Sequence, residues 1–192
     1  MMADDPGFFV SVLCDVFNPA KGAPEPNESR RRRARTSYSL LTEFVVMPGQ
    51  QGGEVDPAIL NKWVRDVREL AAKEDRTVIA DQYIGHTLAH APADADGGWP
   101  HRTIREIIEE LRSTELERGI NIGRFNMRGA FNKAIYEGGK QERGLAEQAR
   151  SWAKIAEKWP RTHAMLLEIA KDWDAHAERE DQRAKQDEMR YE

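Results

Sequence analysis

The stretch DPAILNKWVRDVRELAAK, residues 56–73, carries the clearest fold signal in this chain of 192 residues. Its apolar side chains recur at the spacing of one helix face: Ile59, Leu60, Trp63, Val64, Val67, Leu70 and Ala71. Asp56 is a favourable helix N-cap, and Pro57 is tolerated in the first helical turn. The stretch therefore predicts an amphipathic helix whose apolar side must be covered by other parts of the protein.

The same periodicity recurs on both sides of this stretch. It predicts further helices over residues 8–17, 38–45, 78–91, 104–111, 116–127, 145–159 and 165–177. No segment alternates apolar and polar residues as a half-buried strand does, so we expect almost no strand. Short connections make consecutive helices antiparallel neighbours. We predict an all-α fold, an array of about seven to eight antiparallel helices, with a degenerate helical-hairpin repeat left open.

The end of the chain differs from the rest. The apolar period fades after Ala177, and Glu, Asp, Arg, Lys and Gln dominate from there on. Such a segment has little apolar surface to bury. We therefore expect a single helical domain over residues 1–177, followed by a charged helical extension or a frayed tail over residues 178–192.

Composition limits the class of protein. Lys and Arg number 29 against 33 Asp and Glu, so the formal net charge is −4, and 40% of the residues are hydrophobic. These values exclude collagen-like and wholly disordered chains. Cys14 is the only cysteine, so an intrachain disulfide cannot form. No apolar run approaches the roughly 18 residues of a membrane helix, and we expect a cytoplasmic protein.

A basic run, Arg30 to Arg33 with Arg35, is the strongest local charge. Arginines neutralise phosphates and so favour nucleic acid. However, the chain is acidic overall, and no aromatic residue accompanies the run before Tyr38. We expect the arginines to lie in a solvated linker or to pair with acidic side chains of a partner, and we do not expect nucleic acid to bind.

The densest group of possible metal ligands comprises His86, His90, Asp94, Asp96 and His101. Two histidines four residues apart share a helix face, and a loop ligand could complete a site for zinc or another divalent transition metal. The sequence lacks the glutamate that directly follows the first histidine in metalloprotease helices. The other interpretation is structural, with the histidines at the edge of a buried stripe and the aspartates in turns or caps. We favour the structural interpretation and expect no cofactor.

Four other residues are candidates for binding. Trp99 lies outside the helical pattern and could anchor a partner. Arg124, Asn126 and Arg128 form a polar strip that could receive a phosphate, a carboxylate or a peptide backbone. The strip could equally form an internal polar network, and we favour that interpretation.

No catalytic group stands out. Cys14 lies on a very apolar helix, where a thiolate is disfavoured. The glutamates of residues 106–117 alternate with Arg105, Arg112 and Arg118, which is typical of a charged outer helix face. The sequence therefore provides no recognisable nucleophile with its base.

Three quoted stretches carry a resemblance: LAHAPADADGGWP, ELRSTELERGINIGRFNMRG and EGGKQERGLAEQARSWAKIAEKWPRT. Together they resemble the C-terminal helical region of large bacterial multidomain proteins, a family without an assigned activity. The resemblance implies a tail that serves upstream domains, and no catalytic residue follows from it. We expect a non-enzymatic interaction or scaffold module that binds a protein partner or its own upstream domains. The alternative is a metal-dependent hydrolase that uses His86, His90, Asp94, Asp96 and His101.

Overall fold

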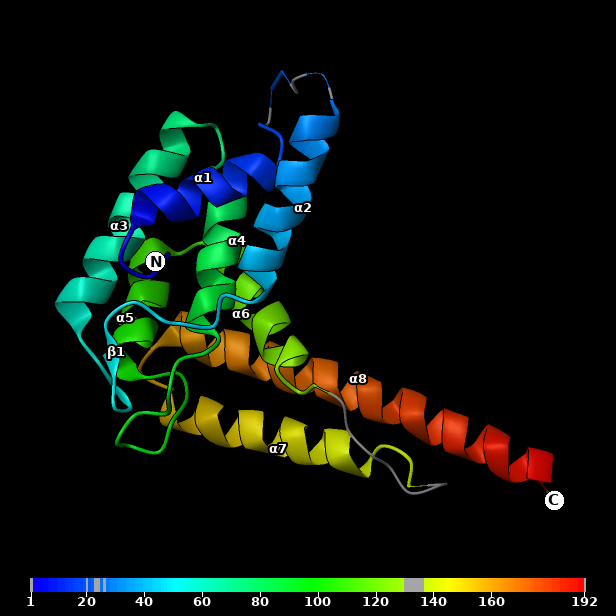
Figure 1. The fold of residues 1–192 in the computed structure, drawn as a ribbon. Coiled ribbons are helices and arrows are strands. Elements are labelled where there is room, and N and C mark those ends of the chain that lie inside the picture. Colours follow the sequence, from blue (N-terminus) through cyan, green and yellow to red (C-terminus); the bar gives the residue numbers. More distant parts are fainter. Residues whose placement is uncertain (1, 20, 23–24, 26, 130–136, 192) are drawn as a thin grey trace. The chain divides into compact units, whose positions relative to one another are not determined.

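The computed structural model describes residues 2–19, 21–22, 25, 27–129 and 137–191. Within these residues it is almost entirely helical, which confirms the predicted all-α class (Figure 1). The helices are α1 (Pro6–Val16), α2 (Glu28–Thr42), α3 (Pro57–Lys73), α4 (Thr77–Leu88), α5 (Arg102–Leu111), α6 (Thr114–Asn126), α7 (Lys140–Ile155) and α8 (Pro160–Tyr191). The only sheet in the described part is a hairpin of β1 (Gln50–Gln51) and β2 (Glu54–Val55).

Polar caps explain where the first helices begin. The carboxylate of Asp5 accepts a hydrogen bond from Phe8 N at 2.9 Å, and that of Asp56 accepts one from Ala58 N at 2.8 Å. Each carboxylate satisfies a backbone amide in the first helical turn, where the amides have no intrahelical hydrogen-bond partner. Asn27 does the same for α2 by accepting from Arg30 N at 2.9 Å. Because Asn27 caps it, α2 begins at Glu28 and contains the arginine run, which we had expected in a linker.

The chain forms two compact units, each built from segments that are distant in the sequence. Unit 1 consists of Met1–Pro92 and Ser113–Phe125, and unit 2 consists of Ala93–Arg112 and Asn126–Glu192. The expectation of one helical domain over residues 1–177, with an extension or tail over residues 178–192, stays a prediction.

Helix α1 is the centre of unit 1. It packs against α2, α3 and α4, and lies across them in Figure 1. Phe9 is fully buried, with its ring centroid 4.9 Å from that of Trp63 and 5.9 Å from that of Phe44. The indole Nε1 of Trp63 donates to the carbonyl oxygen of Met2 at 3.0 Å. The N-terminal segment is therefore fixed to α3 by both apolar packing and a buried hydrogen bond.

Helices α4 and α6 approach each other closely in unit 1. A Cβ atom at Gly119 would collide with the carbonyl oxygen of Gln82, and one at Gly123 would lie 2.7 Å from the Cβ of Ala89. Gly85 faces α6 in the same way, against the backbone of Leu116. Gly119 and Gly123 of α6 thus allow the two helices to approach closely.

Unit 2 contains the helical hairpin of α7 and α8, which run antiparallel (Figure 1). Buried alanines of α7, including Ala149 and Ala153, keep its packed face flat. Ion pairs from Arg143 to Asp181 and from Arg150 to Asp174 connect the two helices along their length. Helix α8 therefore remains helical well past Ala177.

The described helices differ from those that span a membrane. None of them combines the length and the apolar character that crossing a bilayer demands.

The helix contact in unit 1 generates the first prediction. Replacing Gly119 with alanine places a methyl group against the Gln82 carbonyl, so we expect Gly119→Ala to lower the free energy of unfolding by about 1–3 kcal/mol. Gly144 of α7 is the matched control, because no atom lies within 4 Å of its virtual Cβ. Gly144→Ala should raise the free energy by up to about 1 kcal/mol through helix propensity alone. Urea unfolding followed by circular dichroism measures both, and equal effects at the two sites would contradict the close contact.

Candidate functional site

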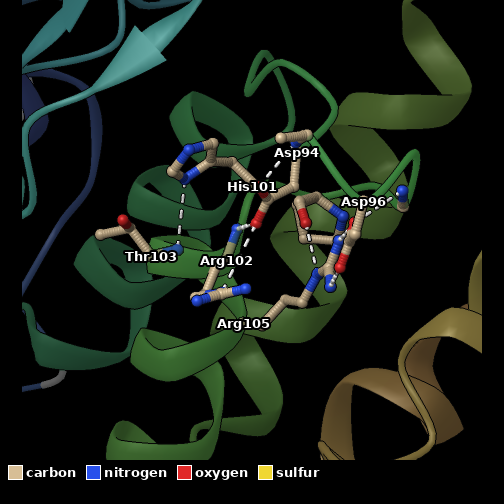
Figure 2. A network of polar contacts seen from close by, with 9 residues as sticks. Asp94, Asp96, His101, Arg102, Thr103 and Arg105 are labelled. Carbon is tan, nitrogen blue, oxygen red and sulfur yellow. Dashed lines mark hydrogen bonds and ion pairs between the residues drawn. The ribbon is translucent and has the colours of Figure 1, made fainter.

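The loop before α5 holds three of the predicted metal ligands (Figure 2). Asp94 accepts hydrogen bonds from Arg102 N at 2.8 Å and from Ala95 N at 2.7 Å. The Nδ1 atom of His101 accepts from Thr103 N at 3.3 Å, so His101 is the N-cap of α5. Both side chains therefore satisfy backbone amides at the start of this helix.

Asp96 forms the strongest polar contact of the loop. Its two carboxylate oxygens accept from the guanidinium of Arg105 at 2.8 and 2.9 Å, a bidentate pair. The hydrogen bonds from Arg105, together with the amide of Gly98, hold the pKa of Asp96 down at about 2, although partial burial opposes the shift. The carboxylate is therefore ionised and bonded to arginine at any ordinary pH.

Arg105 itself is fully buried, in contrast to the charged outer face that we expected. Its Nε donates to the carbonyl oxygen of Pro100 at 2.6 Å, and its guanidinium carbon lies 4.7 Å from the ring centroid of Trp159. Trp99 is also buried, with its ring centroid 5.4 Å from that of Trp152. The structure thus places Trp99 in the core of unit 2, where its ring is not exposed to an incoming partner.

The two other predicted ligands, His86 and His90, lie at the α4–α6 contact of unit 1. The ring of His86 stacks on that of Tyr83 at 5.1 Å, and its Nε2 atom is enclosed without a hydrogen-bond partner. Burial lowers the pKa of His86, and neighbouring His90 lowers it further. Burial and then the charge of Arg124 lower the pKa of His90. These groups form a cluster that favours neutral imidazoles.

The five predicted metal ligands are thus divided between the units. His86 and His90 belong to unit 1, and Asp94, Asp96 and His101 belong to unit 2. Among the described residues, no three or more His, Cys, Asp or Glu side chains are grouped so that they could hold a metal ion. The metal-dependent hydrolase stays a prediction, without a specific observation in its favour.

The predicted polar strip is also divided. Arg124 lies on α6 in unit 1, and burial lowers its pKa. Asn126 and Arg128 belong to unit 2, where Asn126 is exposed. Arg128 forms an ion pair with the buried Glu142 at 2.6 Å, and its guanidinium lies over the ring of Trp173. At Arg128 the contacts are those of an internal network, the interpretation that the sequence favoured.

Sequence patterns missed an apolar depression of unit 1. A cavity of about 410 Å³ lies among α1, the C-terminal end of α2, the segment that leads to β1, and the first turn of α3. Its apolar lining consists of Met2, Ala3, Phe8, Leu40, Phe44, Val46, Met47 and Ile59. We call this cavity with its lining the α1–α3 pocket.

The exposed side chains of the α1–α3 pocket are unusual for a monomer surface. Phe8, Leu40, Val46 and Ile59 remain 39–51% exposed, although all of them are large and apolar. Scattered exposed apolar residues are ordinary, but a cluster around a depression is typical of an interaction site. The only signal in the sequence was the very apolar first helix, which had to be covered by something.

A second depression in unit 1 contains the single cysteine. Its volume is about 430 Å³, and its lining includes Ser11, Cys14, Asp15, Lys73 and Glu74. Burial raises the pKa of the Cys14 thiol, which outweighs the opposing effect of the Arg76 charge. The thiol is therefore a poor nucleophile at neutral pH, in agreement with the apolar setting of its helix.

The chain was compared with known proteins. No protein-family model, no curated protein and no solved structure matches it.

The buried pair of unit 2 generates the second prediction. Asp96→Asn leaves the charge of Arg105 buried without its counter-ion, so we expect the free energy of unfolding to fall by about 2–3 kcal/mol at pH 7. The folded-state pKa of Asp96 is depressed from its ordinary 3.8 to about 2, so the ion pair stabilises above pH 3.8 and loses its effect as the pH falls through 2. The difference between wild type and variant should shrink over this interval.

Urea unfolding of both proteins at several pH values measures this difference. The exposed Asp187 of α8 provides the control, since Asp187→Asn removes the same charge without a buried partner. A difference between wild type and Asp96→Asn that stays constant down to pH 2 would show that the carboxylate does not stabilise through its charge.

The histidine cluster of unit 1 generates the third prediction. Both folded-state pKa values lie below the ordinary 6.5, so below pH 6.5 the unfolded chain takes up protons more readily than the folded chain. The free energy of unfolding should therefore fall as the pH falls below 6.5. The double variant His86→Gln, His90→Gln should lose less stability between pH 7 and pH 5 than wild type does. If both proteins lost the same free energy of unfolding between pH 7 and pH 5, these histidines would not be the cause of the loss.

Proposed function

We propose that this protein is a non-enzymatic interaction module and that the α1–α3 pocket binds an amphipathic helix of a partner protein. One observation carries the proposal: four large apolar side chains, Phe8, Leu40, Val46 and Ile59, stand half-exposed around one cavity. Leaving these side chains in contact with water costs free energy that a partner's apolar side chains would recover on binding. Helix-in-groove recognition uses such a surface.

The lining supports binding over catalysis. The described residues that line the pocket supply apolar groups, the carboxamides of Gln50 and Gln51, and the carboxylates of Asp4 and Glu43. They include no imidazole, thiol, hydroxyl or ammonium group. A nucleophile paired with a base, as group transfer requires, is therefore not assembled from them.

The carboxylates and the methionines of the pocket lining indicate what kind of helix would bind there. Because the charged groups of the lining are carboxylates, Lys or Arg beside the apolar positions of the partner helix would be favoured. Met2 and Met47 lie in the same lining and are buried, and methionine adapts to irregular apolar shapes. We therefore expect a helix with apolar residues at i, i+3 or i+4, and i+7, and with basic residues on its flanks.

A displayed library of amphipathic helical peptides tests this function. Selection on the full chain should enrich peptides with the apolar and basic pattern described above. Ile59→Asp places a charge in the pocket, and we expect it to weaken binding of the selected peptides at least about tenfold, because the peptide's apolar side chains would meet a desolvated carboxylate.

Val78→Asp is the matched control. Val78 lies in the first turn of α4, as Ile59 does in α3, and is 67% exposed outside the pocket. It should leave peptide binding unchanged. Selection without the expected pattern, or equal binding by Ile59→Asp and wild type, would overturn the proposed site.

A further inference from the structure

Helix α2 of unit 1 displays arginines that the fold does not use. Arg33 pairs with Asp15 at 3.5 Å, and Arg30 donates to the side chain of Asn18 at 3.2 Å. The guanidinium groups of Arg31, Arg32 and Arg35 are exposed and make no hydrogen bond or ion pair with the described part of the chain. Three such cations within two turns repel one another, and near a helix N-terminus they also oppose the helix dipole.

An exposed aromatic ring continues this arginine face. Arg31, Arg35 and Tyr38 occupy positions i, i+4 and i+7 of α2, so they lie on one flank of the helix. Tyr38 is 53% exposed. The sequence alone indicated no aromatic residue beside the arginine run. Because the run is helical, Tyr38 lies on the same flank of the helix, one turn beyond the last arginine.

Unit 1 contains further rings on α4 and at the end of α1. Burial raises the pKa of the Tyr83 hydroxyl, and Tyr38 raises it further. The ring of Tyr83 in turn stacks on His86 at 5.1 Å and lies 5.3 Å from that of Phe17. Tyr83 of α4 therefore belongs to an aromatic group with Phe17 and His86.

The combination distinguishes among anionic partners. Guanidinium groups bind phosphates in a bidentate manner, and exposed rings stack on unpaired bases, so both parts fit a single-stranded nucleic acid. An acidic peptide would form ion pairs with the arginines but would have no group that stacks on the tyrosine ring. A lipid surface needs apolar side chains beside the arginines, whereas Thr36, Ser39 and Thr42 are exposed after them on α2, and the exposed Leu40 lies about 180° around the helix from Arg31. The net charge of −4 belongs to the whole chain, while binding depends on the local potential.

We propose that the face of α2 formed by Arg31, Arg32, Arg35 and Tyr38 binds a single-stranded nucleic acid, with phosphates on the arginines and a base on the tyrosine ring. This surface is distinct from the α1–α3 pocket, so it adds a second class of partner to the proposed function. Recognition of this type depends on the backbone and on stacking, and is largely independent of sequence.

Fluorescence anisotropy with labelled single-stranded oligonucleotides, oligo(U) and oligo(dT), tests the inference on the full chain. Binding to three arginines predicts that log K falls with log salt concentration at a slope of about −2. Arg31→Gln with Arg35→Gln should reduce that slope by about 1.4. Tyr38→Ala should weaken binding about tenfold at constant salt, whereas Tyr38→Phe should retain it, because phenylalanine keeps the stacking ring.

The controls separate this surface from ordinary charge effects and from the pocket. Arg65→Gln removes an exposed arginine of α3 and should leave affinity near that of wild type, as should Ile59→Asp in the pocket. Full binding by Tyr38→Ala would overturn the stacking that defines the proposal. Tighter binding to duplex DNA, to phosphatidylserine vesicles or to poly-glutamate would assign the arginines to another anion and overturn it as well.

Discussion

The two adjacent phenylalanines of α1 impose the constraint on which unit 1 depends. Successive residues of a helix point about 100° apart, and the face of α1 that packs into the core contains Phe9, Val12 and Leu13 but not Phe8. Phe9 is fully buried against Trp63 and Phe44, and Phe8 is consequently left 43% exposed. The same packing that fixes α1 on α3 therefore creates an apolar side chain at the surface, and the α1–α3 pocket forms around it.

The helices could be predicted from the sequence because their signal is local. An apolar stripe with the period of a helix is present whatever the stripe packs against, and each predicted segment overlaps a helix of the structure, although the segments 38–45, 78–91 and 145–159 extend past the helix ends. The start of α2 was missed for a local reason as well. Five arginines obscured the pattern, and only Ser37 and Leu41 of this helix are buried, so Asn27 and intrahelical hydrogen bonds determine its length. Division of the chain into two units has no local signal at all.

The functional surfaces depend on partners that are distant in the sequence, and for that reason their prediction was incomplete. Arg105 looks like part of a charged outer face beside the glutamates of α5, yet Asp96 and Trp159 enclose it. The sequence predicts Trp99 as an exposed anchor, but in the structure its ring packs against Trp152. The α1–α3 pocket was even harder to predict from the sequence, because its lining comes from α1, α2, the hairpin and α3. No single segment contains the periodicity or motif that would reveal such a surface.

Helix α2 contributes to both proposed surfaces of unit 1, each with a different part of its length. Its first turns carry the unpaired arginines, and its last turn contributes Leu40 to the α1–α3 pocket. Between them, Ser37 donates to Asp15 of α1 at 3.0 Å, next to the buried Leu41. These few contacts hold the helix on α1 while leaving most of its circumference exposed. A helix needed only for the core would be expected to bury a continuous stripe, as α3 does with Leu60, Trp63, Val64, Val67 and Ala71, so the sparse burial of α2 favours a role outward from the fold.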